Sequence, residues 1–515
     1  MDDSFPSPPL ARVDGPLPAW MATMDGDSWR HACAQYQSRG GRLAALWGTD
    51  ARDCGAGLLV HALLAWNGRL LWLTTAAHPM PPHYPDISDI FPAAARPERA
   101  LTDLLGIDCR PHDPRPWLRH NAWSAHEFPL RADFAGGTQG ADTPYPFTPV
   151  GGEGVHEIAV GPIHAGTIEP GHFRFSVVGD EVLRLESRLG YAHKGAEKRL
   201  ADLAPAEGIR LAGRICGDST VAYALAYAMA IEALDGHAIP ARAQGLRALL
   251  LERERIANHL GDLGALCGDA GLAFGQAQFG LLKERWLQTH HQMFGHRYLM
   301  DSITIGGVAS DLGTPECRQM ETELAGLEEE VHTLEDIISE HAGLQERFLD
   351  TGTVSAEQVL THNGVGMAAR AAGVLRDLRV EFPHAPYTRL NMENPLRTQG
   401  DVAARVALRF AEIHAAAGLL RDILAKLPQG PLQAPAPDKT QHTRAARALG
   451  GAEGWRGEVF VTVERYGGDG LHRVHIHDPS WQNWPLLELA ATDGLVPDFP
   501  LINKSFNLAY SGHDL

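Results

Sequence analysis

The sequence predicts an α+β protein in which a small α+β N-terminal domain precedes a larger, mainly helical domain with peripheral hairpins. Three observations support this prediction. Short β-rich runs gather early in the chain, a stretch rich in glycine, proline and threonine follows them, and helical periodicity dominates the remainder. With 515 residues, of which 44% are apolar, the chain can bury more than one hydrophobic core. The expected divisions are a flexible arm at 1–25, a first domain at 26–135, a linker at 136–155 and a second domain at 156–515.

The elements of the first domain follow from local patterns. Apolar runs at 58–66 and 70–75 are typical of buried strands, and the pattern at 96–105 is typical of a helix. Residues 1–25 are rich in proline, aspartate and serine, so we expect them to pack little.

The second domain should begin with a hairpin and continue as helices. Gly179 and Asp180 separate two β-rich runs within 173–185, which is a hairpin signal. The stretch 208–345 is predicted to be helical. Within it, apolar residues recur every three or four positions through an acidic segment, so an amphipathic helix should turn its glutamates to water. That apolar stripe consists of Leu324, Leu327, Val331, Leu334 and Ile338.

The last part of the chain predicts three further segments. A second long helix should occupy 402–427 because Gly400 and Asp401 form a start signal before an apolar-periodic run. The stretch 428–457 is expected to be loose, and 459–476 alternates like a final hairpin.

Composition excludes several classes of protein. Lys and Arg number 45 against 63 for Asp and Glu, a formal charge of −18, which disfavours nucleic acid as a partner. No apolar run reaches the roughly 18–20 residues of a membrane span. The opening MDDSFPSPPL lacks the pattern of a secretory signal, so we expect a cytoplasmic protein. The six cysteines contain no CxxC pair, which argues against a disulfide framework, a zinc ribbon or an iron–sulfur cluster held by this chain alone.

One predicted helix carries charged residues on an apolar stripe. Glu252, Arg255 and His259 stand at i, i+3 and i+7, on the same helix face as Leu263 and Leu266. Charged groups on such a stripe must be paired. Two interpretations remain open at this point: a buried Glu–Arg pair with a satisfied histidine, or a row of proton-handling groups beside a redox centre.

Other chemistry-bearing residues gather where loops meet elements. Histidine, glycine and charge mix in four segments, each of which is ordinary turn chemistry if taken alone. The segments are HAGTIEPGHFR at 164–174, YAHKGAEK at 191–198, RICGDSTVA at 214–222 and the C-terminal stretch 475–515.

Taken in order, these segments resemble a known family. GPIHAGTIEPGHFRF, RLGYAHKGAEKRL, GRICGDSTVAYALAYAMAIE, LLERERIANHL, SITIGGVASDL and TQGDVAARVALRF are similar to consecutive signatures of the large subunit of group 4 energy-converting [NiFe]-hydrogenases and formate hydrogenlyases. They also resemble its relative, the D (49 kDa-type) subunit of complex I. PERALTDLLGIDCRPHDPRPWLRH, at 97–120, resembles the complex I C (30 kDa-type) subunit. The resemblance implies a fused C/D large subunit.

The departures from the family pattern bear on the metal. In the hydrogenases, four thiolates from two CxxC pairs hold nickel and iron. At the matching positions this chain has Cys216, Ser219, Ser480 and Asn483, so one thiolate of four remains. A hydroxyl or a carboxamide does not replace a bridging thiolate, and we therefore expect no NiFe centre and no resident metal. The alternative for Cys216 is a buried, inert thiol.

Complex I offers a second template, in which the metal cavity receives a quinone. The ungapped match puts Gly217 where the quinone-contacting tyrosine would be, so a quinone site here would be rebuilt. His164, His172, Asp269 and Arg370 are the candidate catalytic residues that the resemblance implies. The candidate cofactor-binding residues are Cys216, Ser219, Asp478, Ser480 and Trp481. Apart from Asp269, these residues are expected to converge on one cavity.

The resemblance implies a function and partners. We expect the large subunit of a complex I-like membrane oxidoreductase whose electron transfer is coupled to NADH/quinone-type chemistry. It would lie on the inner face of the cell membrane beside an iron–sulfur small subunit and antiporter-like membrane subunits. Two alternatives stay open: an active hydrogenase or formate hydrogenlyase subunit, and a non-catalytic scaffold that couples a redox module to the membrane arm.

Overall fold

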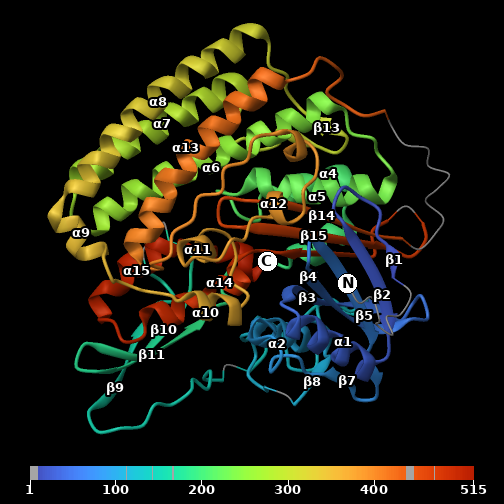
Figure 1. Ribbon diagram of the computed structural model, residues 1–515. Helices are drawn as coiled ribbons and strands as arrows, with labels where there is room; N and C mark the ends of the chain where they lie inside the picture. Colours follow the sequence, from blue (N-terminus) through green and yellow to red (C-terminus); the bar gives the residue numbers. More distant parts are fainter. Residues whose placement is uncertain (1–9, 112, 142, 165–167, 436–445, 469) are drawn as a thin grey trace.

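The computed structural model describes residues 10–111, 113–141, 143–164, 168–435, 446–468 and 470–515. It confirms the predicted mixture of small sheets and many helices. Figure 1 shows the N-terminal sheet at the lower right, the long helices at the upper left, and β14 and β15 between them.

A five-stranded sheet organises the N-terminal part. Its order is β1-β2-β5-β4-β3, with β2 parallel to β5 and the other pairs antiparallel. One face packs on α1 and α2 through Trp29 and Leu101, whereas Trp47 and Trp72 on the other face join the large core cluster that also contains residues of the long helices. The elements are β1 (Ala11–Arg12), β2 (Ala19–Met24), α1 (Gly26–Ser38), β3 (Arg42–Ala51), β4 (Gly57–Trp66), β5 (Arg69–Ala76), β6 (His78–Pro79), β7 (Pro82–Pro85), η1 (Pro92–Ala94), α2 (Ala95–Leu105) and β8 (Asp108–Arg110).

The flexible arm expected at 1–25 is wrong over much of its described part. Ala19–Met24 forms β2, an inner strand that pairs with β5 in register from Ala19↔Leu70 to Met24↔Thr75. Proline and aspartate dominate the local composition, but this short run finds its backbone partners far along the chain. Residues 1–9 of the expected arm lie outside the described residues. The division of the chain into two domains and a linker remains a prediction.

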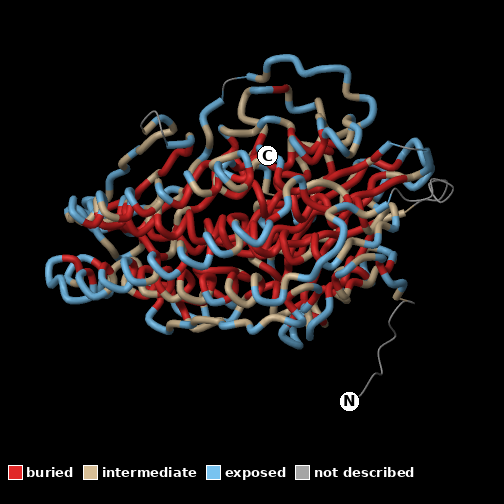
Figure 2. Tube along the Cα trace, turned by 90° about the horizontal axis from the view of Figure 1, so that it is seen from above, coloured by how far each residue is buried: buried red, intermediate tan, exposed pale blue. Residues whose placement is uncertain are grey.

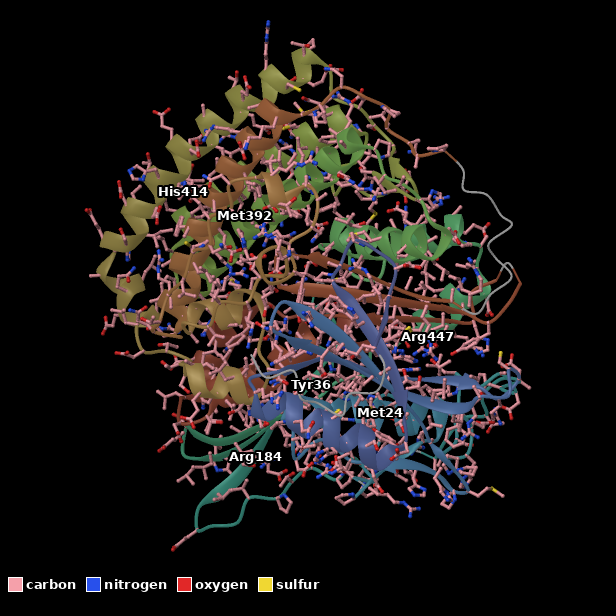
Figure 3. The ribbon with its side chains drawn as sticks, turned by 45° about the vertical axis from the view of Figure 1, so that its right-hand side comes forward. Met24, Tyr36, Arg184, Met392, His414 and Arg447 are labelled. Atoms are coloured by element: carbon pink, nitrogen blue, oxygen red, sulfur yellow. The ribbon has the colours of Figure 1, made fainter. Side chains whose placement is uncertain are left out.

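The hairpin expected within 173–185 is confirmed. Strands β10 (His172–Val178) and β11 (Glu181–Arg188) pair antiparallel, and β9 (Val155–Val160) lies on the other edge of β10. Gly179 supplies the turn with a left-handed φ of 61° that favours glycine. Arg184, labelled in Figure 3, stands on the exposed side of this small sheet.

Long helices form a bundle beside the sheets. The stripe at 324–338 lies on α8, and all five of its residues are at most 7% exposed, as the periodicity predicts. His414 of α13, labelled in Figure 3, contacts Glu335 of α8 at 3.1 Å, which joins the two helices. The expected helical stretch is interrupted by β12 (Ile303–Thr304) and β13 (Gly307–Val308). The helices are α3 (Ala196–Asp202), α4 (Pro205–Ala212), α5 (Thr220–Asp235), α6 (Ala241–Asp269), α7 (Ala273–Phe294), α8 (Thr314–Glu340), α9 (Ala342–Phe348), α10 (Ala356–Thr361), α11 (Gly366–Ala371), α12 (Leu378–Glu381), η2 (Tyr387–Arg389) and α13 (Val402–Lys426).

A three-stranded sheet, ordered β14-β15-β16, lies against α5. Its first strand corrects the loose stretch expected at 428–457, because β14 (Ala446–Glu453) pairs with β15 (Glu458–Arg465) along its whole length. Gly450 explains the packing: a Cβ there would lie 2.0 Å from the Ala226 carbonyl oxygen of α5. Glycine permits this close approach and also weakens the strand signal in the sequence. Residues 436–445 lie outside the described part.

The C-terminal segment returns to the middle of the molecule. After β16 (Arg473–His477), the chain forms α14 (Ser480–Ala491), η4 (Val496–Asp498), α15 (Phe499–Phe506) and α16 (Ser511–Asp514). Figure 2 shows buried segments running through the centre and exposed ones around the rim. Among the described helices, none is both long enough and apolar enough to span a membrane.

Candidate functional site

The loop between α4 and α5 forms the centre of the candidate site. Cys216 on this loop is 5% exposed, and its Sγ donates a hydrogen bond to Asp218 Oδ1 at 3.0 Å. Burial raises the pKa of the Cys216 thiol, and the Asp218 carboxylate raises it further. Cys216 therefore carries its proton at neutral pH, which supports the interpretation as an inert thiol.

Arg456 places a cation beside this thiol. Its Nη1 lies 3.7 Å from the Cys216 sulfur, and its two terminal nitrogens donate to the two Asp218 oxygens at 2.7 and 2.6 Å. Burial by itself would raise the pKa of Asp218, but the guanidinium outweighs it and holds that pKa below its ordinary value. The Arg456 side chain is 6% exposed and that of Asp218 39%, so the ion pair lies at the boundary between the buried site and the solvent.

Ser219, at the second thiolate position, forms hydrogen bonds with the same Arg456–Asp218 pair and with Trp455. Its Oγ accepts from Trp455 Nε1 at 3.1 Å and from Arg456 Nη1 at 3.2 Å, and it donates to Asp218 Oδ1 at 3.1 Å. The Arg456 guanidinium also stacks on the Trp455 ring, 3.9 Å from its centroid.

The chain after β16 supplies the opposite side of the site. Asp478 accepts a hydrogen bond from Tyr223 of α5, and its charge contributes to the raised pKa of Cys216. Gly512 packs so closely that a Cβ there would lie 2.3 Å from the Tyr223 hydroxyl and 2.7 Å from Asp478. Cys216, Ser219 and Asp478 therefore converge although they are far apart in sequence.

Ser480 and Asn483, at the other two thiolate positions, are held by hydrogen bonds that involve backbone groups. Ser480 donates its N–H to Asp478 Oδ1 at 2.7 Å, and its Oγ accepts from the N–H of Ala509 at 3.0 Å. Asn483 bonds both polar groups of Val365, at 3.1 Å to the N–H and 3.2 Å to the carbonyl. Trp481, one of the candidate cofactor-binding residues, is stacked on His513 with ring centroids 4.0 Å apart.

These contacts do not fit a nickel–iron centre. The remaining thiol is protonated and faces the Arg456 cation, and the side chains at the other three positions are hydrogen-bonded to protein groups. A bimetallic centre needs several thiolates, and a guanidinium within 4 Å of the sulfur opposes a divalent cation there by charge.

A second polar stripe of α6 faces the site, and its residues were not among the candidates predicted from the sequence. Asn258 donates to the Asp218 carbonyl at 2.7 Å, and Glu254 accepts from the backbone N–H groups of Val221 and Ala222 at the start of α5. Asp262, one turn further, accepts from Asn507 Nδ2 at 2.6 Å. The sequence does contain a signal for them, because Glu254, Asn258 and Asp262 recur at i, i+4 and i+8. They form a helix face next to the one predicted from Glu252, Arg255 and His259.

Glu254 is the proton-carrying group of this stripe. Burial raises the pKa of Glu254 to about 8, although the two backbone N–H groups act in the opposite direction. At neutral pH Glu254 is therefore largely a neutral acid beside the Asp218 loop.

Replacing Glu254 by glutamine should change how stability depends on pH. Between its ordinary pKa of 4.5 and about 8, the unfolded chain releases this proton and the folded protein keeps it. Wild-type stability therefore falls as pH rises, by up to about 1.4 kcal/mol per pH unit, and the Glu254→Gln protein should lack this loss. Denaturant unfolding from pH 5 to 8 should show that the free energy of unfolding of the variant increases relative to that of the wild type as the pH rises. Glu346→Gln, on an exposed position of α9, is the control. A constant difference between Glu254→Gln and wild type across this range would contradict the assignment.

His164 and His172 lie in a separate set of contacts. His164 Nε2 bonds the Gly171 carbonyl at 2.7 Å, and His172 Nδ1 bonds the Gly161 carbonyl at 3.2 Å. Their loop contacts the C-terminal segment through Glu169, which accepts from the N–H of Ser511 at 3.1 Å. The expected convergence of both histidines with Cys216 is thus not seen in their contacts, because the C-terminal segment lies between. Residues 165–167 of this loop lie outside the described residues.

Arg370 belongs to a buried ionic cluster and not to the Cys216 group. It donates to Glu412 at 2.6 Å, to Glu453 at 3.2 Å and to the Arg376 carbonyl at 2.6 Å. Arg255 and His259 bond the same Glu412, so the stripe predicted on α6 is buried and paired. The cluster joins side chains of α6, α11, α13 and β14. Contacts between these distant elements hold Arg370 in the cluster and away from the Cys216 group.

Asp269 lies at the last residue of α6. Burial raises the pKa of Asp269, while Lys504 acts to lower it. Lys504 also lies 3.7 Å from Asp262, so Asp269 is connected to the polar stripe of α6 through a lysine of α15.

Comparison with known proteins agrees with this architecture. Residues 22–139 match the family model described as respiratory-chain NADH dehydrogenase, 30 Kd subunit. Residues 278–449 match the model described as respiratory-chain NADH dehydrogenase, 49 Kd subunit. The two matches stand in one chain, in the order that the sequence motifs predict.

Individual relatives align with most of the chain. Formate hydrogenlyase subunit 5 of Escherichia coli (strain K12) is 30% identical over 93% of this chain and 86% of its own length. The fused C/D-type NADH-quinone oxidoreductase protein of Bacteroides fragilis is 26% identical over 82% of this chain and 83% of its own length. A chain from the structure of the membrane-bound sulfane sulfur reductase (MBS), an archaeal respiratory membrane complex, has 25% identity and a TM-score of 0.66. That match covers 70% of this chain and 99% of the MBS chain.

The fused order of the two matches, the extent of the alignments and the shared fold agree with one another. The chain belongs to the family of complex I-like large subunits in which the 30 kDa-type and 49 kDa-type subunits are fused, together with the subunits of formate hydrogenlyase and related energy-converting hydrogenases.

Proposed function

We propose that this chain is the large subunit of a membrane-bound, complex I-like redox complex that works without a nickel–iron centre. One observation carries the proposal: the Arg456–Asp218 pair stands against the one thiol that remains at the four ligand positions, with Arg456 Nη1 3.7 Å from its sulfur. The Arg456 guanidinium supplies fixed positive charge beside Cys216, so the site does not need a metal ion to provide it.

The remaining residues of the site would hold and position protons. Asp478 orients the Tyr223 hydroxyl, and Glu254 keeps its own proton near neutral pH beside the Asp218 loop. Electrons would come from an iron–sulfur cluster of a small partner subunit, and antiporter-like subunits would anchor the assembly at the inner face of the membrane. Family membership supports these partners, since the relatives include subunits of a formate hydrogenlyase and of NADH-quinone oxidoreductases.

The purified complex should contain no stoichiometric nickel in this subunit and should neither take up nor evolve hydrogen with viologen dyes. Elemental analysis and a viologen assay check both, with a family member that has all four thiolates as the positive control. About one nickel per chain, or hydrogen turnover, would restore the alternative of a working hydrogenase.

A cavity beside His172 favours a quinone as the small-molecule partner. The cavity measures about 460 Å³ and is lined by His172, Arg174, Arg188, Tyr145 and Phe147, among others. His172 Nε2 is buried and has no hydrogen-bond partner among the described residues, and the Phe147 ring lies 5.2 Å from the imidazole. Because the Nδ1–H of His172 donates to the Gly161 carbonyl, its free Nε2 is an acceptor. We propose that a flat quinone-type ring would stack on Phe147 and, in its quinol form, donate a hydroxyl hydrogen bond to His172 Nε2.

Quinone binding should therefore depend on His172. Titration of the complex with a short-chain ubiquinol analogue, followed by tryptophan fluorescence, should give roughly tenfold weaker binding in His172→Gln, the effect of one lost hydrogen bond. His156→Gln, on an exposed position of the neighbouring β9, should bind as the wild type does. No binding by the wild type, or equal affinity in both variants, would favour the scaffold alternative.

A further inference from the structure

Three potential metal ligands meet inside the N-terminal domain, away from the site described above. Asp86 follows β7, Glu98 lies on α2 and Cys109 lies on β8, and one ligand atom of each falls within 4.8 Å of the other two. Their exposures are 6%, 2% and 4%, so all three are enclosed by the core between α1, α2 and the sheets.

The two carboxylates of this cluster have no cationic partner. Among the described residues, no lysine, arginine or histidine side chain forms an ion pair with Asp86 or Glu98. Arg30, the nearby cation, donates to the backbone carbonyl of Asp86 and pairs with Asp89 instead. Buried carboxylates without a counter-charge are costly unless they hold a proton or a metal ion.

A fourth polar group faces the same point. Tyr84 pairs with Cys109 across the β7–β8 ladder, so the two side chains leave the sheet on the same face. Tyr84 is 1% exposed, and its hydroxyl has no hydrogen-bond partner among the described residues. Within the described part of the chain, the Tyr84 hydroxyl is therefore a buried, unpartnered polar group beside Cys109 of the cluster.

Backbone groups already hold the two carboxylates in place. Ile87 N–H donates to Glu98 Oε1 at 3.0 Å, and Ser88 N–H donates to Asp86 Oδ1 at 2.7 Å. Hydrogen bonds of this kind orient ligand side chains in metal sites. The donor set of one thiolate and two carboxylates suits a borderline-soft, tetrahedral cation such as Zn²⁺ better than Mg²⁺ or Ca²⁺, which prefer oxygen alone.

We propose that Asp86, Glu98 and Cys109 form a buried structural site for a zinc-like divalent cation, with the Tyr84 hydroxyl beside the fourth coordination position. The cation would neutralise the unpaired carboxylates and tie α2 to β7 and β8. It would bind far in sequence from the positions matching the hydrogenase thiolates and is independent of the proposed electron transfer.

The described residues offer one other such group, which provides a matched control. Asp53, Cys54 and His472 also come within 4.8 Å of one another, but Asp53 and Cys54 are exposed and His472 is only partly covered. A single cysteine substitution in each group therefore distinguishes the buried site from an adventitious surface site.

The experiment uses the purified full chain, stripped with EDTA and titrated with Co²⁺ as a spectroscopic probe and with Zn²⁺. We expect one tightly held ion per chain by native mass spectrometry and a thiolate-to-cobalt absorption band in the near ultraviolet. Cys109→Ser should abolish the band, whereas Cys54→Ser should leave it unchanged. Glu98→Gln should weaken Zn²⁺ binding at least tenfold, and far-ultraviolet circular dichroism should show that all three variants are folded.

Three outcomes would overturn the proposal. Wild-type chain that holds no Zn²⁺ after stripping and reloading would mean that Asp86 and Glu98 share a proton instead. A cobalt band lost in Cys54→Ser would assign the metal to the surface group. A band that survives Cys109→Ser would remove the thiolate from the site.

Discussion

Replacing Arg370 by methionine should lower the free energy of unfolding by about 3–5 kcal/mol, the range for removing one partner of a buried ion pair. Arg370 is 1% exposed, and the carboxylates of Glu412, Glu453 and Asp377 that surround it are all at most 4% exposed. Methionine fills the space of the stem but leaves these acids without their common cation. Urea unfolding measured at pH 7 provides the value.

The charge balance of this cluster also predicts how the stability of Arg370→Met depends on pH. Four carboxyl groups (Glu252, Asp377, Glu412 and Glu453) face three guanidinium groups (Arg255, Arg370 and Arg379). Burial raises the pKa of Glu453 to about 8, so its proton balances the set at neutral pH. Without Arg370 a further acid must keep its proton, and the variant should lose stability more steeply than the wild type as pH rises above 5.

A surface pair is the matched control for Arg370→Met. Arg285 contacts Glu330, and the two side chains are 50% and 48% exposed. Arg285→Met should cost less than about 1 kcal/mol, because water screens the pair and solvates the glutamate that remains. If Arg370→Met were as mild as this control, the cluster would be open to solvent, and the assignment of Arg370 to structure would fail.

Replacing Arg255 by alanine should cost about 3 kcal/mol, at the lower end of the range for a broken buried pair. Arg255 donates to Glu252 at 3.0 Å and to the carbonyl oxygen of Glu453 at 2.8 Å. Arg379, 2.7 Å from Glu252, remains as a partner of that glutamate and moderates the loss. Thermal unfolding of the variant measures it.

The outcome for Arg255 also tests the helix face. Arg347 forms an outer ion pair with Asp498, in which the side chains are 43% and 29% exposed, and Arg347→Ala should change the midpoint of unfolding little. An Arg255→Ala midpoint within about one degree of the wild type would mean that this face of α6 meets solvent in the assembled protein.

Local patterns predicted the elements whose evidence is contained in a few adjacent residues. The stripe on α8, the β10–β11 hairpin and the buried stripe on α6 appear in the structure as their spacing indicated. Strands β2 and β14 were missed, because β2 pairs with a distant strand and Gly450 of β14 permits the close approach of α5. Their signals depend on contacts between segments, which a window along the chain does not contain.

The candidate site divides in the same way. The sequence indicated that three of the four thiolates are absent and that Cys216, Ser219 and Asp478 belong together, and the contacts through Tyr223 and Arg456 agree. It did not indicate Arg456, because a single arginine after a tryptophan has no pattern of its own. Only the fold brings that arginine from the turn after β14 to the loop before α5.

The sequence by itself determined the class of the protein and the absence of a thiolate set, since both depend on which residues are present and in what order. The tertiary structure alone decided what occupies the position beside Cys216, where Arg370 binds, and that Asp86, Glu98 and Cys109 meet. The physical reason is that a buried charge must find its partner in space. The chain satisfies that requirement with groups from segments as distant as 218 and 456, which no local spacing encodes.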